Sequence, residues 1–387
     1  MRADSDPPGA VRIVKGIEAL STWTLRCMAA APEQWTAQAW LTCLRPISHV
    51  YGAAVSLRTA LFSCGLAGTH RLPVPVLSVG NISVGGSGKT PCVEMLAGRL
   101  RERGQQVVII LRGYRSDSTK PTVVSDGTSV RCKPPVAADE AYLLARHLPG
   151  VAVLTGADRY RVGEVAIEQV ACGVIILDDG FQHRRLHRDL DIVLVDAVNP
   201  LGYGRLLPSG LLREPPEALE RADIVVVTNA DAGRDVDSAI RAIRQYAPAA
   251  PIARAVHRPV SLIDVRSEDR VGLERLTGQR LLAVSGIANP SRFKAMLGQL
   301  GARVAAHRIF PDHHRYTPAD LELIGRAAKD DGASMVVTTE KDMVKLAHLD
   351  IAQVDMPLYA LSISFELLEG ADLLEAMLNR LVQPSAS

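Results

Sequence analysis

The chain has 387 residues, 47% of them hydrophobic but only 4% aromatic, as expected of an aliphatic-rich α/β protein with two or three domains. Its formal net charge is only +2 and like charges form no runs, which argues against a dedicated nucleic-acid-binding protein. The six cysteines are scattered without a C-x-x-C pair, so reduced thiols in a cytosolic setting are favoured over a disulfide framework or a zinc site.

The N-terminal segment superficially resembles a secretory signal. Arg12 and Lys15 precede a moderately apolar stretch that ends in Ala29-Ala30-Ala31. Glu18 and Arg26 interrupt this stretch, so we do not expect a cleaved signal. No apolar run reaches the roughly 20 residues that a membrane-spanning helix needs, and an integral membrane protein is therefore not expected.

Residues 33 to 66 carry apolar side chains at helical spacing, with polar ones between them. The apolar positions include Trp35, Trp40, Leu41, Leu44, Ile47, Val50, Tyr51, Ala54, Leu61 and Phe62. This pattern predicts an amphipathic helix, for which two environments stay open. The helix packs on the protein's own core, the alternative that periodicity alone favours slightly, or it lies in a membrane interface with its tryptophans near the headgroups.

A phosphate-binding loop is predicted in the stretch PVLSVGNISVGGSGKTP. The apolar run Val74 to Val79 predicts a strand, and Pro91 suits the first turn of a helix. Between them, glycines let backbone N–H groups converge on phosphate oxygens, Lys89 can reach the β- and γ-phosphates, and the Thr90 hydroxyl can bind Mg²⁺. Ser83 stands where the strict motif G-x-x-x-x-G-K-[ST] has its first glycine. The predicted nucleotide-binding residues are Ser83, Val84, Gly85, Gly86, Ser87, Gly88, Lys89 and Thr90.

Short aliphatic and β-branched runs then alternate with helical stretches. The runs are Val107 to Leu111, Val151 to Leu154, Val174 to Leu177, Ile192 to Val195 and Ile224 to Val227. Nearly continuous apolar strands separated by helices predict a doubly wound, mostly parallel sheet, in which ligands bind beyond the carboxyl ends of the strands. Arginines follow two of these strands, in Arg112-Gly113-Tyr114-Arg115 and at Arg159, and lie either near the phosphates or in solvent.

A dense polar cluster, DDGFQHRR, directly follows the run Val174 to Leu177. An apolar strand that ends in aspartate downstream of a P-loop resembles a Walker-B element, whose carboxylate can hold Mg²⁺, so Asp178 and Asp179 are candidate ligands. Another acidic pair, Asp139-Glu140, is by itself only an acidic helix start. Thr228 to Asp231 could read a nucleotide base, but it lacks the lysine of the guanine-specific N-K-x-D motif, and base recognition is the less favoured interpretation.

A second unit of alternating strands and helices begins after about residue 255. Its apolar runs lead into the polar stretches SGIANPSRF, FPDHHRYT and TTEKDMVKL, so a smaller α/β domain is expected. Asp312-His313-His314 invites a metal site, but neighbouring histidines rarely face the same way and no third ligand is apparent. These histidines are either ordinary loop residues or take part in proton transfer.

Together these motifs resemble the tetraacyldisaccharide 4'-kinase family, the lipid A 4'-kinases of Gram-negative bacteria. The resemblance begins at about Trp35, rests most strongly on DDGFQHRRLHRDLDIVLVD and GYGRLLPSGLLREP, and accounts for the shortened P-loop with Ser83. Residues 1 to about 30 have no counterpart. The resemblance implies a P-loop NTPase-like kinase core over residues 73–255 and a smaller C-terminal α/β domain over residues 256–387. Amphipathic membrane-interface helices would lie within residues 1–72.

The resemblance also implies the reaction. The γ-phosphoryl group of ATP would pass to the 4'-hydroxyl of tetraacyldisaccharide 1-phosphate and give lipid IVA, at the cytoplasmic face of the inner membrane. The cofactors would be ATP and Mg²⁺, and the protein a peripheral monomer that binds its lipid disaccharide and the membrane surface but no nucleic acid. For residues 33 to 66, this favours the membrane interface over the protein core.

The family motifs imply roles for individual residues. Asp139 would be the catalytic carboxylate and His313 its partner, together activating the sugar hydroxyl. Because the two lie in different predicted domains, domain closure would bring them together over the acceptor. The metal ligands would be Thr90, Glu140, Asp178 and Asp179. The candidates for contacts with substrate and phosphate are Gln182, His183, Arg205 and Arg213.

Two other functions stay open from the sequence. One is a P-loop GTPase of the switch or metallochaperone type, with Thr228 to Asp231 as base reader. The absence of a lysine at Ala230 and of clustered Cys and His ligands argues against it. The other is a small-molecule ATP kinase without a membrane role, in which residues 33 to 66 belong to the core.

Overall fold

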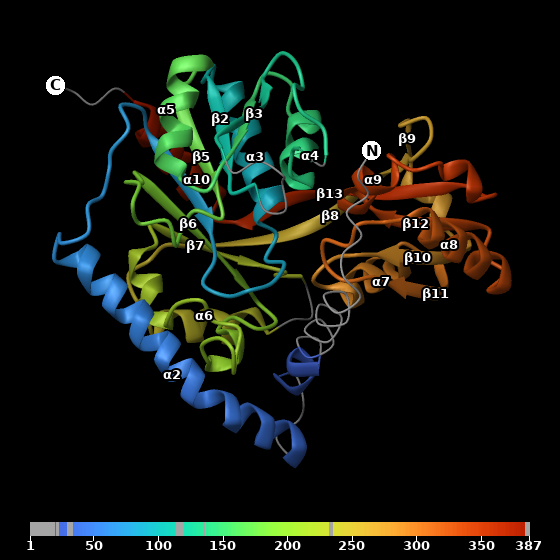
Figure 1. Cartoon of the computed structure of the whole chain (residues 1–387), viewed down its shortest axis with the longest axis horizontal. Helices are drawn as coiled ribbons and strands as arrows, with labels where there is room; N and C mark the ends of the chain where they lie inside the picture. The colour runs from blue at the N-terminus through green and yellow to red at the C-terminus, as the bar shows by residue number, and fades with distance from the viewer. Residues whose placement is uncertain are drawn as a thin grey trace, which may run out of the picture.

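The computed structural model describes residues 20, 23–28, 34–113, 120–134, 136–231 and 235–383. Tyr114 and Arg115 lie outside these ranges, as does most of the segment that resembles a signal. Helices lie on both faces of one long sheet that extends through both parts of the molecule (Figure 1).

The strand order of the sheet is β11-β10-β12-β13-β8-β7-β6-β1-β5-β2-β4-β3. Its N-terminal part consists of β1 (Val76–Gly80), β2 (Val107–Leu111), β3 (Thr122–Asp126), β4 (Ala152–Thr155), β5 (Val174–Asp178), β6 (Leu190–Asp196) and β7 (Ile224–Thr228). These strands pair in parallel, except that β3 at the edge runs antiparallel to β4. The predicted doubly wound, mostly parallel α/β fold is therefore confirmed.

The C-terminal part is built on the long antiparallel pair of β8 (Ile252–Asp264) and β13 (Leu358–Glu369). Its other strands are β9 (Arg270–Val271), β10 (Arg280–Ser285), β11 (Arg303–Ile309) and β12 (Met335–Thr339). The first residues of β8 pair with β7, and the rest of the strand pairs with β13. The predicted domain boundary at residue 255 thus falls inside a strand that joins both parts, and the division into domains stays a prediction.

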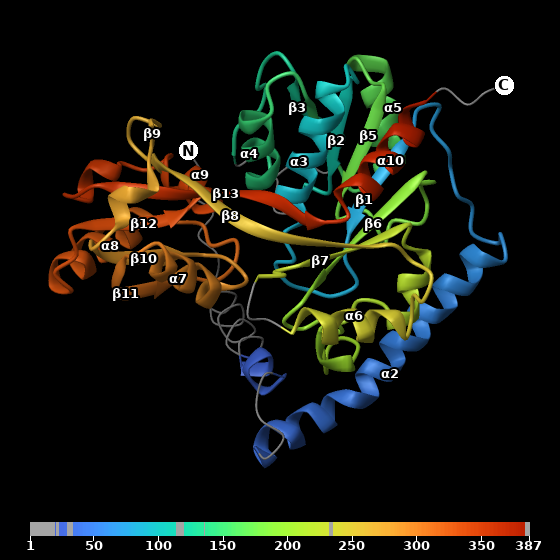
Figure 2. The same ribbon diagram turned by 180° about the vertical axis from the view of Figure 1, so that it is seen from behind.

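Helices cover both faces of the N-terminal part because alternate side chains of its buried strands point to opposite sides. One face packs on α3 (Lys89–Glu102), α4 (Asp139–His147) and α10 (Ala371–Val382). The other face packs on α5 (Arg159–Gln169), which Figures 1 and 2 show on the opposite side of the sheet. The helical spacing after the P-loop is confirmed by α3, whose Val93, Leu96 and Leu100 are buried.

Four further helices complete the layers. They are α6 (Val236–Arg244), α7 (Pro290–Gln299), α8 (Pro318–Asp330) and α9 (Glu340–Leu346), with short 3₁₀ helices at Gly202–Gly204, Pro216–Arg221, Leu273–Leu276 and Ile351–Gln353. In the C-terminal part, α7 and α8 pack on opposite faces of β10 and β12. The second unit is therefore also a helix-covered sheet, as its sequence pattern predicts.

The long helix α2 (Trp35–Ser63) lies apart from the sheet, along one side of the molecule (Figure 1). Polar contacts hold it: Ser48 donates to the Leu206 carbonyl at 3.1 Å, and the Tyr51 hydroxyl donates to the Arg213 carbonyl at 2.8 Å. Its buried residues are Ala37, Leu41 and Ser48, and most of its apolar side chains are exposed. The helix therefore does not pack on the core as a whole, and no helix of the described residues is long and apolar enough to cross a bilayer.

Candidate active site

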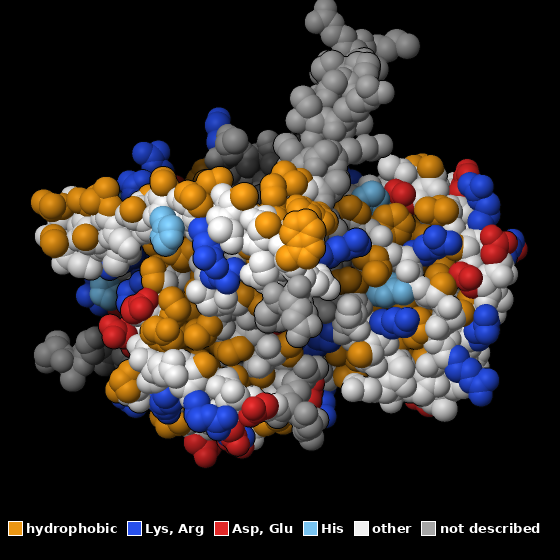
Figure 3. Space-filling model, turned by 90° about the horizontal axis from the view of Figure 1, so that it is seen from below, with side chains coloured by type: hydrophobic (Ala, Val, Ile, Leu, Met, Phe, Trp, Pro, Cys, Tyr) orange, Lys and Arg blue, Asp and Glu red, His pale blue; other side chains and the backbone are white. Residues whose placement is uncertain are grey.

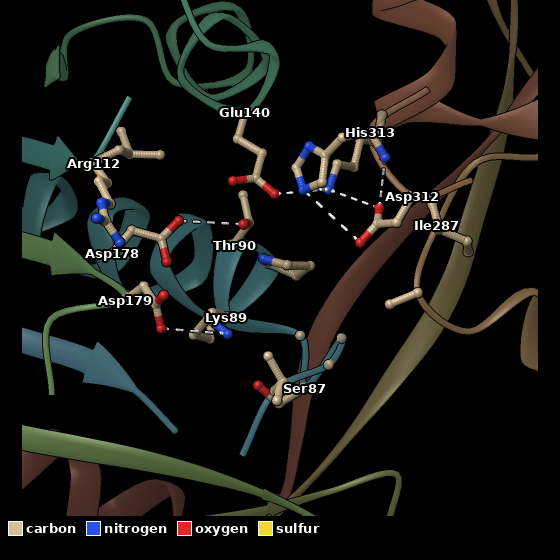
Figure 4. A pocket seen from close by; sticks show the side chains of 18 of the residues that line it. Ser87, Lys89, Thr90, Arg112, Glu140, Asp178, Asp179, Ile287, Asp312 and His313 are labelled. Carbon is tan, nitrogen blue, oxygen red and sulfur yellow. Dashed lines mark hydrogen bonds and ion pairs between the residues drawn. The ribbon is translucent and has the colours of Figure 1, made fainter. Parts of the chain in front are cut away.

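A cavity of about 1030 Å³ lies beyond the carboxyl ends of β1 and β5, where the two parts of the sheet meet. Its walls come from the P-loop, the residues after β5, the start of α4, the loop between β11 and α8, and the start of α9. In open α/β sheets this edge is where ligands bind. Figure 4 shows charged side chains from both parts of the sheet turned toward the same space.

Two glycines of the P-loop take backbone conformations that other residues rarely adopt. Gly85 has a φ of 129° and Gly88 a φ of 81°, in the left-handed region that favours glycine. A Cβ on Gly88 would also collide with the imidazole of His257, whose ring packs against the loop from β8. Since α3 begins directly at Lys89, the loop lines the cavity at the N-terminus of a helix, where backbone N–H groups suit an anion.

Asp178 and Asp179 follow one another along the chain but take different partners. Asp178 is 4% exposed, and its carboxylate accepts a hydrogen bond from the Thr90 hydroxyl at 3.3 Å. Burial above all, with repulsion from neighbouring carboxylates, raises the pKa of Asp178 to about 7. Asp179 lies 3.6 Å from Lys89 Nζ and 2.8 Å from the Arg213 guanidinium. Burial opposes its ionisation, but these two cations outweigh burial and lower the pKa of Asp179.

On the opposite wall, Lys341 at the start of α9 joins the two parts of the molecule. Its Nζ lies 2.9 Å from Glu140 Oε1, 3.3 Å from His313 Nε2 and 3.6 Å from Asp312 Oδ1. Burial raises the pKa of Glu140, but nearby cations, Lys341 first, outweigh it and lower the pKa. Burial and the same ammonium group lower the pKa of His313, which favours a neutral imidazole. Figure 4 shows Glu140, Asp312 and His313 facing one another across the cavity from Asp179 and Lys89.

Comparison with known proteins identifies the family of the chain. The family model described as "Tetraacyldisaccharide-1-P 4'-kinase" matches residues 40–383 of the chain. The chain belongs to this kinase family. The resemblance inferred from its motifs is confirmed, and the match supports the lipid A 4'-kinase over the GTPase alternative.

Individual members of the family also match the chain over most of its length. The tetraacyldisaccharide 4'-kinase of Anaeromyxobacter dehalogenans (strain 2CP-C) is 45% identical over 329 residues, which cover 85% of this chain and 87% of the relative. That of Halothermothrix orenii is 36% identical over 374 residues, covering 92% and 97%. The crystal structure of LpxK from Aquifex aeolicus in complex with ATP superimposes with a TM-score of 0.72 at 33% identity, covering 89% of this chain and 100% of that chain.

Most of the residues predicted for this 4'-kinase site line the cavity, while three do not. The residues that do are Val84, Gly85, Gly86, Ser87, Gly88, Lys89, Thr90, Glu140, Asp178, Asp179, Gln182, His183, Arg213 and His313. Ser83 forms an isolated bridge to Leu212 instead. Arg205 lies in the neighbouring turn, where its carbonyl accepts from the Leu212 N–H at 3.0 Å. Asp139 is the first residue of α4, next to Glu140 but outside the lining.

The other predicted polar sites divide in a similar way. Arg112 and Arg159 line the cavity, so they do lie near the predicted phosphate end. Asn229 is 1% exposed, donates to Asp196 at 2.8 Å and is not part of the lining, so it does not face the cavity as a base reader. His314 bonds to Asp320 at 3.0 Å and, unlike His313, does not line the cavity. No cluster of three or more potential ligands for a metal ion occurs among the described residues.

Sequence reasoning missed several cavity residues of the 4'-kinase. Tyr51 and Arg58 reach the cavity from α2, and Arg58 donates to the Gln182 carbonyl at 2.5 Å. Lys341 lies within TTEKDMVKL, a motif that carried the family resemblance, so its position was visible although its role was not. No sequence pattern marked His147 as a site residue, because the residues that it contacts are far away in the chain.

His147 connects α4 to both α3 and α9. It bonds to Glu94 at 3.1 Å and forms an ion pair with Glu340 at 3.3 Å. Burial disfavours the imidazolium, but the interactions with the carboxylates of Glu340 and Glu94 outweigh it and raise the pKa of His147 to about 9. Its side chain is only 16% exposed, so solvent screens these contacts little. They clamp α9 of the C-terminal part onto the helices of the N-terminal part.

The His147 clamp should make stability depend on pH. Because the folded pKa of about 9 lies above the unfolded value of about 6.5, the folded chain binds more protons between these values. The protonated imidazole contributes up to about 3 kcal/mol to the free energy of unfolding. This contribution is fully present below pH 6.5 and is lost as the pH rises through 9. We expect denaturant unfolding to show wild type more stable than His147→Gln at pH 6, with the difference shrinking toward pH 10. A difference that stays constant across this range would contradict the clamp.

Proposed function

We propose that this lipid A 4'-kinase transfers the γ-phosphoryl group of ATP to the 4'-hydroxyl of a tetraacyldisaccharide 1-phosphate within the central cavity, giving lipid IVA. The observation that supports this most strongly is that the P-loop Lys89, the buried Asp178 and the distant His313 line one cavity. The Aquifex aeolicus relative, which has the same fold, binds ATP. Phosphoryl transfer has a loose transition state, so cations at the phosphate and a proton acceptor at the hydroxyl are the groups needed.

Magnesium fits the residues around Thr90. Asp178 is buried beside the Thr90 hydroxyl, and such oxygen ligands, supplemented by nucleotide phosphates, are what Mg²⁺ prefers. Thr90 and Asp178 would therefore hold the ion, with Glu140 on the facing wall as a further ligand. Asp179 is the weaker candidate, since Lys89 and Arg213 already neutralise it. An ion held by Thr90 and Asp178 would supply positive charge that neutralises the phosphates of the nucleotide.

Proton removal from the sugar hydroxyl would fall to His313 with Asp139. A lowered pKa keeps His313 neutral and able to accept a proton. Asp139 begins α4 beside the cavity residue Glu140, so a closing movement of this helix end toward the loop that carries His313 would bring the two together. In this proposal, His313 accepts the proton and Asp139 orients and stabilises the resulting imidazolium.

The acceptor would bind at the end of the cavity near α2. Gln182, His183 and Arg213 lie there, together with Tyr51 and Arg58 from α2 itself. In the part of the chain that the structure describes, Gln182 Oε1 and His183 Nε2 are buried without a hydrogen-bond partner, which suits them to a bound sugar. Arg205, outside the lining, stays the weakest of the proposed substrate contacts.

We further propose that α2 binds the cytoplasmic face of the inner membrane, with the chain a peripheral monomer. Its exposed apolar side chains are Trp35, Ile47, Val50, Leu57 and Leu61. In Figure 3, hydrophobic side chains form a band over this part of the molecule with Lys and Arg beside it. Apolar groups flanked by cations suit an anionic lipid surface, and a helix that also reaches the cavity would bring the acceptor's headgroup to the site.

Leu57→Glu should weaken binding to vesicles of phosphatidylethanolamine and phosphatidylglycerol by about tenfold. The side chain is 63% exposed, and losing the burial of one leucine in lipid is worth roughly 1.5–3 kcal/mol. Co-sedimentation with the vesicles measures the effect, and the melting temperature should not change. Leu323→Glu, at an exposed apolar position on α8, is the matched control and should bind like wild type. Equal binding by all three proteins would contradict a membrane role for α2.

The proposed reaction is tested by incubating the protein with γ-labelled ATP, Mg²⁺ and tetraacyldisaccharide 1-phosphate in detergent micelles. We expect label in the extracted lipid, at the 4' position, when ATP is supplied. Label released only as inorganic phosphate, or transferred equally well from GTP, would contradict the proposal.

A further inference from the structure

We propose that Lys341 is a second phosphate-binding cation of this kinase. In the ligand-free chain its ammonium group bridges Glu140 and His313, and when ATP is bound it turns to the γ-phosphoryl oxygens. This rests on the proposed function, since it assigns a residue to the phosphate site of that reaction.

The side chain of Lys341 lies in the part of the cavity where the terminal phosphate would bind. Its side chain is 21% exposed, lines the cavity and meets three polar groups there, at 2.9 Å from Glu140, 3.3 Å from His313 and 3.6 Å from Asp312. Lys89 reaches the same cavity from the P-loop and pairs with Asp179 at 3.6 Å. Two lysines from opposite parts of the sheet thus enter the space where the terminal phosphate would lie.

Buried contacts of the neighbouring residue hold the backbone at Lys341 in place. The next residue, Asp342, is fully buried and accepts hydrogen bonds from the Gly286 N–H and the Thr339 hydroxyl, each at 2.8 Å. It also pairs with Lys345 at 2.7 Å. A buried charge with several partners fixes its surroundings firmly. The backbone at Lys341 is therefore held in place, and the long side chain can change partners without a change in the fold.

The bridge to Glu140 is not the only connection between α9 and α4. Glu340 pairs with His147, which also bonds to Glu94 on α3. These contacts would keep α9 on α4 when the Lys341 ammonium leaves Glu140. That departure also removes the ammonium group from His313 Nε2, which must accept a hydrogen bond while the ammonium donates to it. Phosphate binding by Lys341 would thus uncover the nitrogen that takes the proton.

During transfer, the bond between the γ-phosphorus and the oxygen bridging to the β-phosphate breaks, and a bond from the 4'-oxygen to the γ-phosphorus forms. The hydroxyl proton passes to His313. Lys341 keeps its proton throughout and stabilises negative charge on the γ-phosphoryl oxygens, as a cation supplied from outside the P-loop does in other phosphoryl-transfer enzymes.

The test compares the affinity for a non-hydrolysable ATP analogue with that for ADP, by calorimetry with the full chain, Mg²⁺ and no acceptor. Lys341→Met should weaken binding of the analogue by about tenfold while ADP binding changes less than about twofold, since only the analogue has a γ-phosphate. With lipid acceptor, kcat should fall by about 10²-fold with little change in the lipid KM. Lys341→Gln provides a second variant should the methionine variant fold poorly, and Lys341→Arg should recover part of the preference for the analogue.

Lys329→Met is the matched control. Lys329 lies on α8 of the same part of the sheet, is 60% exposed and pairs with Asp355, so this variant should bind both nucleotides like wild type. If the Lys341 variants weaken binding of the analogue and of ADP equally, or weaken neither, Lys341 is only a bridge between two helices and the proposal is wrong. The comparison of analogue affinity with ADP affinity needs no lipid. It can therefore contradict the role of Lys341 while label still reaches the lipid, and it can support that role even if the proposed acceptor is wrong.

Discussion

Replacing Lys89 by alanine should lower kcat/KM for ATP by about 10³-fold or more, because a preorganised cation at the transferred phosphate is among the largest contributions to phosphoryl transfer. The lysine is the first residue of α3, and its side chain is 14% exposed in the cavity. The fold should survive, since the buried face of α3 is apolar and Arg213 still neutralises Asp179. Steady-state transfer of label from ATP to lipid measures the loss.

The control for this change is Lys294→Ala, which removes an exposed lysine of α7 that does not line the cavity. It should retain wild-type kinetics. A Lys89→Ala protein that melts like wild type and keeps more than about a third of its activity would show that the P-loop does not grip the terminal phosphate.

Asp139→Asn and Glu140→Gln should affect catalysis in different ways, although the two residues are neighbours. Asp139 is the proposed carboxylate partner of His313, so its amide should lower kcat by about 10³-fold while affinity for a non-hydrolysable ATP analogue changes less than about twofold. Glu140, which faces the cavity and contacts Lys341, should mainly weaken Mg²⁺-dependent nucleotide binding when changed to glutamine. Single-turnover transfer at saturating ATP, with calorimetric titration of the analogue, measures both quantities.

The structure makes this pair decisive because only Glu140 of the two lines the cavity. If Asp139→Asn is nearly as active as wild type while Glu140→Gln abolishes turnover without altering Mg²⁺ dependence, the carboxylate that assists His313 is Glu140, which already faces it. The closing movement of α4 would then be unnecessary.

The sequence was most informative where neighbouring residues act together. The P-loop, its preceding strand and the buried face of α3 follow from spacing along one short stretch, and the apolar runs mark β2, β4, β5, β6 and β7 closely. Asp178 was found because a carboxylate directly follows a buried strand. These features depend on local periodicity and chain direction, which a sequence displays directly.

Features that depend on distant contacts were harder to predict. The long β8 and β13 pair joins both parts of the sheet, so a composition-based boundary at residue 255 fell inside a strand. Arg58 reaches the cavity only because α2 crosses beside the residues after β5. Likewise, Asp139 and Glu140 cannot be told apart by sequence, because one residue of rotation on α4 decides which carboxylate lines the cavity.

The central claim is that the terminal phosphate of ATP lies between Lys89 and the loop that carries His313. A crystal structure of this chain with Mg²⁺ and a non-hydrolysable ATP analogue tests it most directly, through the position of the γ-phosphorus. The account predicts γ-phosphate oxygens within hydrogen-bonding distance of Lys89 Nζ, with the γ-phosphorus on the side of the nucleotide that faces His313. A triphosphate bound outside this cavity, or one whose γ-phosphate points away from His313, would contradict it.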